Sequence, residues 1–110
     1  MSEAHDRIDE IVKGHRVVLF MKGNKFFPQC GFSARAVAVL QQLGASFETV
    51  DVLRDAEIRQ GVKAYANWPT IPQLYVDDEF VGGSDIMFQM FQSGELAKLL
   101  AGEQDAAGGS

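Results

Sequence analysis

The apolar run Val17–Met21 constrains the fold of this chain most strongly. An uninterrupted run of this kind is typical of a strand buried on both faces, so helices must cover both sides of its sheet. A helix is predicted downstream, stopped by Gly44, from the spacing of Phe32, Ala36, Val37, Leu40 and Leu43. A second strand over 47–52 would then pair in parallel with the first through a right-handed crossover.

The remaining segments complete an α/β pattern. We expect helices over about 4–13, 55–66 and 95–100, with Asp55 as the N-cap of the second. Gln73–Val76 and residues 79–81 predict a hairpin, and a further helix should begin at an N-cap formed by Ser84 or Asp85. The fold class is therefore a mixed four-stranded sheet flanked by helices on both faces, with its ligand site at the carboxyl ends of the parallel strands.

Length and charge limit the function. The 110 residues are expected to form one domain, with a folded core over about 4–100 and a flexible tail over 101–110. A net charge of −5 argues against nucleic acid as a partner. No apolar run is long enough to span a membrane, and the N-terminus lacks the pattern of a secretory signal. A single cysteine forms no internal disulfide, so we expect a reducing, cytoplasmic location.

That cysteine, Cys30, falls in the loop or first turn before a predicted helix. Backbone N–H groups and the positive end of the helix dipole favour a thiolate there, which makes the residue a nucleophile or a metal ligand. The alternative is a buried, inert cysteine. Gly31 beside it and the polar approach through Asn24, Lys25 and Gln29 favour exposure.

Four motifs occur in order along the chain: Met21-Lys22-Gly23, Cys30-Gly31-Phe32-Ser33, Trp68-Pro69-Thr70-Ile71-Pro72-Gln73-Leu74 and Gly82-Gly83-Ser84-Asp85. Together they resemble a monothiol glutaredoxin of the CGFS class, from about residue 8 to residue 100. The resemblance implies a thioredoxin fold, bound glutathione and a glutathione-ligated [2Fe–2S] cluster at a homodimer interface. It also implies cluster transfer to acceptor iron–sulfur proteins and a BolA-like protein as a partner.

The resemblance also assigns the binding residues. Lys22 and Arg59 would meet the glycyl carboxylate of glutathione, and the backbone of Ile71, beside a cis Ile71–Pro72 bond, would pair with the cysteinyl unit. Gly83 would allow the backbone to approach glutathione closely, and Ser84 and Asp85 would bind the γ-glutamyl end of glutathione. Read without the family, these residues are a solvated lysine, a surface arginine and a glycine-rich turn with a helix cap.

Other residues are interpreted more simply. Lys63 stays an open candidate for the same end as Arg59, and Trp68-Pro69 is interpreted as a structural corner. His5 and His15 are expected to face solvent. Ser84 departs from the family, because many relatives have cysteine there, and this removes a possible second thiol.

A [2Fe–2S] cluster takes four thiolates, and this chain supplies one. Two chains and two glutathione molecules would supply four, with Cys30 as the protein's iron ligand. A glutathione-dependent thiol–disulfide oxidoreductase is the alternative, since a thiolate at Cys30 could attack a mixed disulfide. The loop 24–28 is longer than in dithiol relatives and is expected to move the glutathione sulfur. A third possibility is a regulatory adaptor that acts with a BolA-like protein.

Overall fold

The computed structural model describes residues 3–102 and contains one mixed sheet with the strand order β2-β1-β3-β4. Its strands are β1 (Val17–Met21), β2 (Glu48–Asp51), β3 (Gln73–Val76) and β4 (Glu79–Gly82). Strands β1 and β2 are parallel, and β3 is antiparallel to both β1 and β4. The predicted parallel pairing of β1 with β2 and the predicted hairpin are both confirmed.

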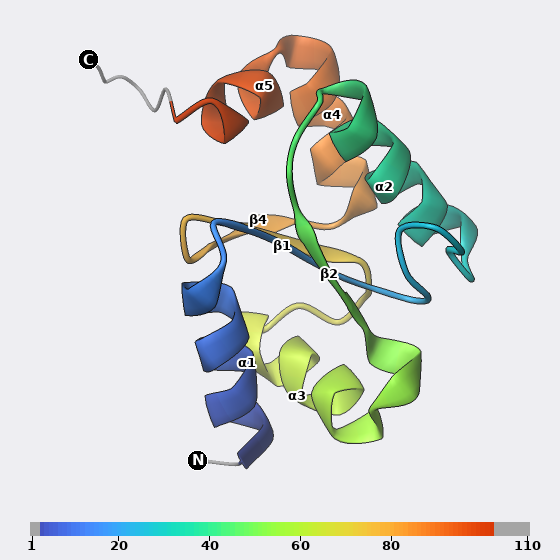
Figure 1. Ribbon diagram of the computed structural model, residues 1–110, viewed down its shortest axis with the longest axis vertical. Helices are drawn as coiled ribbons and strands as arrows, with labels where there is room; N and C mark the ends of the chain where they lie inside the picture. Colours follow the sequence, from blue (N-terminus) through green and yellow to red (C-terminus); the bar gives the residue numbers. More distant parts are fainter. Residues whose placement is uncertain (1–2, 103–110) are drawn as a thin grey trace.

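Helices cover both faces of this sheet, as Figure 1 shows. One face carries α1 (Glu3–Gly14) and α3 (Ala56–Ala66). The other carries α2 (Gly31–Gln42), α4 (Ser84–Ser93) and α5 (Glu95–Leu100). A short 3-10 helix, η1 (Val52–Arg54), joins β2 to α3.

Strand β1 is buried on both faces, as its apolar run predicts. Val17, Leu19 and Met21 pack into the core beneath α2, α4 and α5. Val18 and Phe20 pack into a second core with α1 and α3. The alternation of side chains along a strand thus gives each helical layer its own half of the interior.

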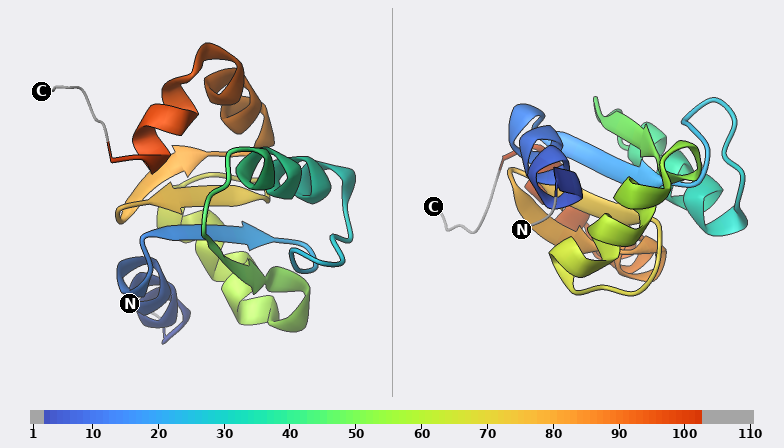
Figure 2. Two further views of the ribbon diagram at one scale, coloured as in Figure 1. Left: turned by 45° about the horizontal axis from the view of Figure 1, so that its top comes forward. Right: turned by 90° about the horizontal axis from the view of Figure 1, so that it is seen from below.

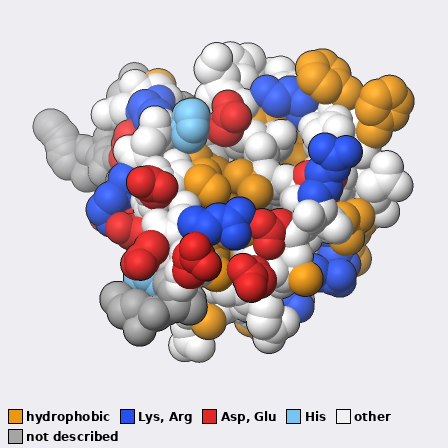
Figure 3. Space-filling model, turned by 60° about the horizontal axis from the view of Figure 1, so that its bottom comes forward, with side chains coloured by type: hydrophobic (Ala, Val, Ile, Leu, Met, Phe, Trp, Pro, Cys, Tyr) orange, Lys and Arg blue, Asp and Glu red, His pale blue; other side chains and the backbone are white. Residues whose placement is uncertain are grey.

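Helices α1 and α3 approach closely at Gly61. A Cβ added there would lie 3.1 Å from both the Ala4 Cβ and the Ile8 Cδ1, so this glycine permits the contact inside a helix. An ion pair also joins the two helices at the surface: Arg7 of α1 lies 2.6 Å from Asp55, which directly precedes α3. Figure 3 shows acidic and basic side chains interspersed over the face that these two helices form.

Several expectations need correction. Neither Ser84 nor Asp85 is the N-cap of α4: Gly83 holds that position, and Ser84 is the first helical residue. The second strand stops at Asp51, because the Asp51 side chain accepts the Leu53 N–H and starts η1. His5 is half-buried against Tyr65, with 5.1 Å between ring centroids, whereas His15 is exposed as expected.

Other predictions hold or remain open. Asp55 is the N-cap of α3 as predicted, accepting from the N–H groups of Glu57 and Ile58. Within residues 3–102 no helix is long and apolar enough to cross a membrane. The single-domain prediction stays a prediction, and the tail predicted over 101–110 lies outside the described residues from 103 onward.

Candidate functional site

The loop between β1 and α2 folds back on itself before it reaches the cysteine. Gln29 donates its backbone N–H to the Lys22 carbonyl at 2.8 Å, and Gly23 forms an isolated β-bridge with Pro28. The Asn24 side chain accepts the backbone N–H groups of residues 26 and 27. Figure 2 shows this loop at the carboxyl end of β1, beside the start of α2. The loop is therefore held by its own hydrogen bonds.

Cys30 is the N-cap of α2, with φ −155° and ψ 141°. Its side chain is partly exposed, which argues against the alternative of a sealed, inert cysteine. The pKa of the Cys30 thiol is lowered, first by the Ser33 backbone N–H and then by the Phe32 N–H and the charge of Lys22, against a cost of burial. The start of the helix therefore stabilises the thiolate more than the neighbouring lysine does.

Two side-chain contacts that the sequence patterns do not predict fix this region. The Ser33 hydroxyl accepts the Lys22 backbone N–H at 3.0 Å, and Ser33 is fully buried. The Asp51 carboxylate accepts from Gly23 at 3.0 Å and from Leu53 at 2.9 Å. The end of β1, the start of α2 and the end of β2 are thereby held together around the cysteine.

A cavity of about 420 Å³ opens beside Cys30. It brings together every residue predicted for the site: Lys22, Cys30, Arg59, Ile71, Gly83, Ser84 and Asp85. Lys63, the open candidate, also lines it, and so do Phe32, Thr70 and Ile86, which were not predicted. Their roles as ligands of glutathione or iron stay predictions.

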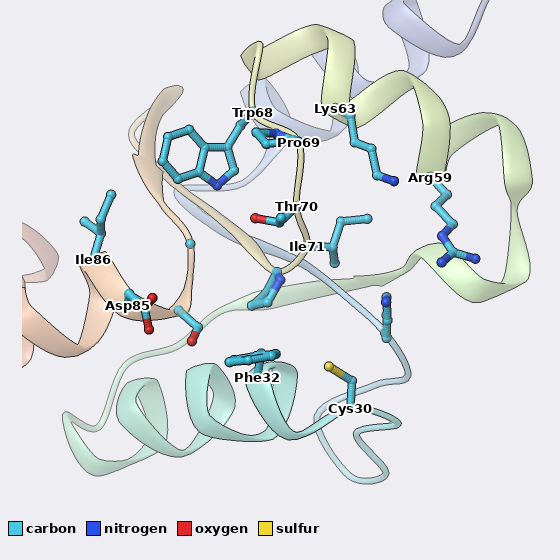
Figure 4. A pocket seen from close by; sticks show the side chains of 14 residues that line it. Cys30, Phe32, Arg59, Lys63, Trp68, Pro69, Thr70, Ile71, Asp85 and Ile86 are labelled. Atoms are coloured by element: carbon cyan, nitrogen blue, oxygen red, sulfur yellow. The ribbon is translucent and has the colours of Figure 1, made fainter.

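The cavity is polarised. In Figure 4, Arg59 and Lys63 reach toward it from α3, Asp85 lies across from them at the start of α4, and Cys30 and Phe32 lie below, at the start of α2. One end therefore suits an anion and the other suits a cation. Asp85 also lies 3.8 Å from Arg35, whose guanidinium lies 3.9 Å from the centre of the Phe88 ring.

The segment from Trp68 to Pro72 forms a wall of the cavity. The Ile71–Pro72 peptide bond is cis, as the resemblance implied. Ile71 precedes β3 and is not paired in the β1–β3 ladder. Its backbone is therefore placed at the edge of the cavity without a strand neighbour.

Trp68 contributes to this wall as well as forming a corner. Its ring packs on Phe80, with 5.5 Å between centroids. The indole nitrogen has no hydrogen-bond partner within residues 3–102 and lies 3.3 Å from where a Cβ on Gly83 would be. The glycine therefore lets α4 start close to the indole.

A thiol at the start of α2, facing a proline segment across a cavity at the edge of a mixed sheet, is the arrangement of the thioredoxin fold. The protein is therefore a thioredoxin-fold thiol protein. The glutaredoxin family model matches residues 17–81, and the chain belongs to the glutaredoxin family. Its relatives and its one cysteine identify it as a monothiol member.

Several proteins similar to this chain agree with this assignment. The chain is 60% identical over 98 residues to a monothiol glutaredoxin ycf64-like protein of Synechocystis sp., covering 89% of this chain and 92% of the relative. It is 52% identical over 93 residues to probable monothiol glutaredoxin 2 of Rickettsia conorii, covering 84% and 87%. The solution structure of reduced poplar apo GrxS14 superimposes with a TM-score of 0.78 at 50% identity, covering 88% of this chain and 89% of that chain. Glutaredoxins use glutathione.

Proposed function

We propose that this protein holds glutathione in the cavity beside Cys30 and, with a second copy of the chain, carries a [2Fe–2S] cluster to acceptor proteins. The observation that carries the proposal is the single cysteine of the chain, partly exposed with a lowered pKa, at the base of a cavity with opposite charges at its two ends. We also propose that the protein is cytoplasmic and that a BolA-like protein is a further partner, besides the second copy of the chain.

Glutathione fits the chemistry of the cavity. Lys22 and Arg59 would bind its glycyl carboxylate, with Lys63 close by on α3. The unpaired backbone of Ile71 would exchange hydrogen bonds with the cysteinyl unit. At the other end, the backbone N–H groups of Ser84 and Asp85 would donate hydrogen bonds to the γ-glutamyl carboxylate. The Asp85 side chain would pair with the ammonium group of the same γ-glutamyl unit.

The cluster is the cargo, and the chain's donor set explains why it would be shared. Within residues 3–102 there is no group of three or more His, Cys, Asp or Glu side chains that could hold a metal ion. Cys30 can therefore supply one thiolate, and the other three must come from outside the chain. Glutathione in each of two cavities and Cys30 of a second copy complete the set. Because two of these donors are exchangeable small molecules, the cargo would be released readily.

A thiol–disulfide oxidoreductase is the second candidate, favoured by the lowered pKa of Cys30. The Cys30 thiolate would attack the glutathione sulfur of a mixed disulfide and release the substrate thiolate. A second glutathione thiolate would then attack the Cys30–glutathione disulfide, forming glutathione disulfide and restoring the Cys30 thiolate. A regulatory adaptor that acts with a BolA-like protein would use the same cluster-bound state.

Anaerobic reconstitution with iron, sulfide and glutathione tests the proposal. We expect a coloured species with the mass of a dimer, which fails to form without glutathione or with Cys30→Ser. Arg59→Gln should raise the glutathione concentration needed, whereas Lys98→Gln, an exposed change on α5, is the matched control. A cluster retained by Cys30→Ser would overturn the ligand assignment. Colourless protein with rapid glutathione-coupled turnover of a mixed disulfide would favour the oxidoreductase.

A further inference from the structure

Gln73, the first residue of β3, has an unusual position for an amide side chain. It is fully buried, and it lies on the sheet face that packs against α1 and α3, two residues from Tyr75. A buried amide must satisfy its two donors and its acceptor within the protein, or it destabilises the fold.

All three functions of the Gln73 amide are used. Its Nε2 donates to the carbonyl of Trp68 at 3.2 Å and to the carbonyl of Thr70 at 3.3 Å. Its Oε1 accepts the Tyr75 hydroxyl at 3.1 Å. The Tyr75 ring itself packs against the rings of Phe20 and Phe80, with centroids 5.6 and 5.5 Å away. The amide is therefore fixed in one orientation from the core side.

The two carbonyls that Gln73 holds belong to the wall of the cavity. Residues 68–72 form no helix or strand, yet Trp68, Pro69, Thr70, Ile71 and Pro72 all line the cavity. The segment is tied to the end of α3 by the bond from the Trp68 N–H to the Lys63 carbonyl at 3.0 Å. Gln73 ties the same segment to the sheet. An apolar side chain of similar size would fill the space but leave both carbonyls without donors.

We propose that Gln73 is a positioning residue for the ligand cavity: by holding the carbonyls of Trp68 and Thr70, it fixes the wall against which the ligand binds. The inference rests on the proposed function for the identity of that ligand, glutathione. Because the Gln73 side chain is fully buried, it does not contact the ligand directly. It would act on the ligand by holding the wall segment in place.

The test compares Gln73→Glu and Gln73→Leu with the unchanged protein. The first keeps the shape but replaces the donating NH₂ by oxygen, and the second removes every hydrogen bond. We expect glutathione to bind at least about tenfold more weakly to both variants in the folded state, a loss on the scale of one or two hydrogen bonds. Binding is measured by titration of backbone amide signals on folded, cluster-free protein.

Trp68 supplies a readout that a general loss of stability would not move. It is the only tryptophan in the chain, so its indole N–H gives one signal and its emission one band. Both should shift in the Gln73 variants before any ligand is added. Leu96→Ala, which truncates a buried residue on α5 outside the cavity, is the matched control. It should lower stability and leave the Trp68 signal and glutathione affinity unchanged.

Tyr75→Phe keeps the inference testable if the Gln73 variants fail to fold. It removes only the bond to Oε1 and leaves both donors in place, so the Trp68 signal should shift and affinity should fall about two- to fivefold. Folded variants that bind glutathione as tightly as the unchanged protein would overturn the role of Gln73. Absence of binding to the unchanged protein would overturn the proposed function instead.

Discussion

The fully buried Ser33 hydroxyl accepts a hydrogen bond from the backbone N–H of Lys22 at 3.0 Å. Lys22 directly follows β1, and Ser33 lies in the first turn of α2. The bond therefore joins the strand to the helix on either side of the loop that carries Cys30. The serine of the Cys30-Gly31-Phe32-Ser33 motif thus has a structural task that is independent of redox chemistry.

Ser33→Ala should lower the free energy of unfolding by about 1–3 kcal/mol, because the backbone N–H of Lys22 loses its hydrogen bond to the buried Ser33 hydroxyl. Chemical denaturation measures the change. Ser46→Ala, at an exposed serine, is the control and should stay within about 0.5 kcal/mol of the unchanged protein. Equal stability of the two variants would show that water replaces the Ser33 hydroxyl.

The rate at which Cys30 reacts with iodoacetamide should rise with pH. The midpoint of this rise should lie below the ordinary thiol pKa of about 8.5. The Ser33 backbone N–H is the main cause of the lowered pKa, so Lys22→Met should raise the midpoint only slightly. The folded thiol has the lower pKa, so stability should increase as pH rises from the folded value to the unfolded one and level off above it. A midpoint at or above 8.5 in the unchanged protein contradicts this assignment.

Asp85→Asn should weaken glutathione binding about three- to thirtyfold, because the ligand's ammonium loses a charged partner. The same change should have little effect on an analogue of glutathione that lacks the amino group. Isothermal titration calorimetry of both ligands against both proteins separates the loss of the contact with the ammonium group from an indirect effect of the substitution. An equal loss for both ligands would mean that Asp85 acts through the start of α4 or through Arg35.

Gly61→Val should lower the free energy of unfolding by about 1–3 kcal/mol. The new Cβ would crowd Ala4 and Ile8 at 3.1 Å, and these belong to α1. Gly14→Val, where nothing lies within 4 Å of an added Cβ, is the control for the change of residue type. Thermal unfolding of both variants gives the comparison.

Gly23→Ala should disturb the cysteine loop without a new charge or a lost side chain. Gly23 has φ +89°, and a Cβ there would overlap the Phe27 carbonyl and lie 2.8 Å from the Gln29 nitrogen. We expect lower stability by about 1–3 kcal/mol and faster hydrogen exchange at Gln29. Unchanged exchange at that amide would show that the loop accommodates the methyl group elsewhere.

The sequence predicts the elements of this fold well, because its signals are local. The run Val17–Met21, the helical spacing after Cys30 and the Asp55 cap each depend on a few neighbouring residues, and each is present. The start of α4 was misplaced because Ser84 and Asp85 both favour the N-cap position, whereas the backbone at Gly83 takes it.

Apart from Cys30, the residues of the site could be predicted only through the family resemblance. Lys22, Arg59 and Asp85 were found through the resemblance, and they do line one cavity with Cys30. The supporting contacts could not be found in this way, because they join positions far apart: the Asp51 carboxylate meets Gly23, 28 residues earlier. Gln73 also looked like an ordinary strand residue until the packing of Tyr75 and the wall segment was known.

The serine at position 33 stands where a second thiol would lie in a dithiol site, and the chain has no other cysteine. A disulfide at Cys30 must therefore be made with a different molecule, either a small thiol or another polypeptide. Every such oxidation adds mass to the protein, so intact mass spectrometry of freshly isolated material would reveal both how much had been oxidised and by which partner.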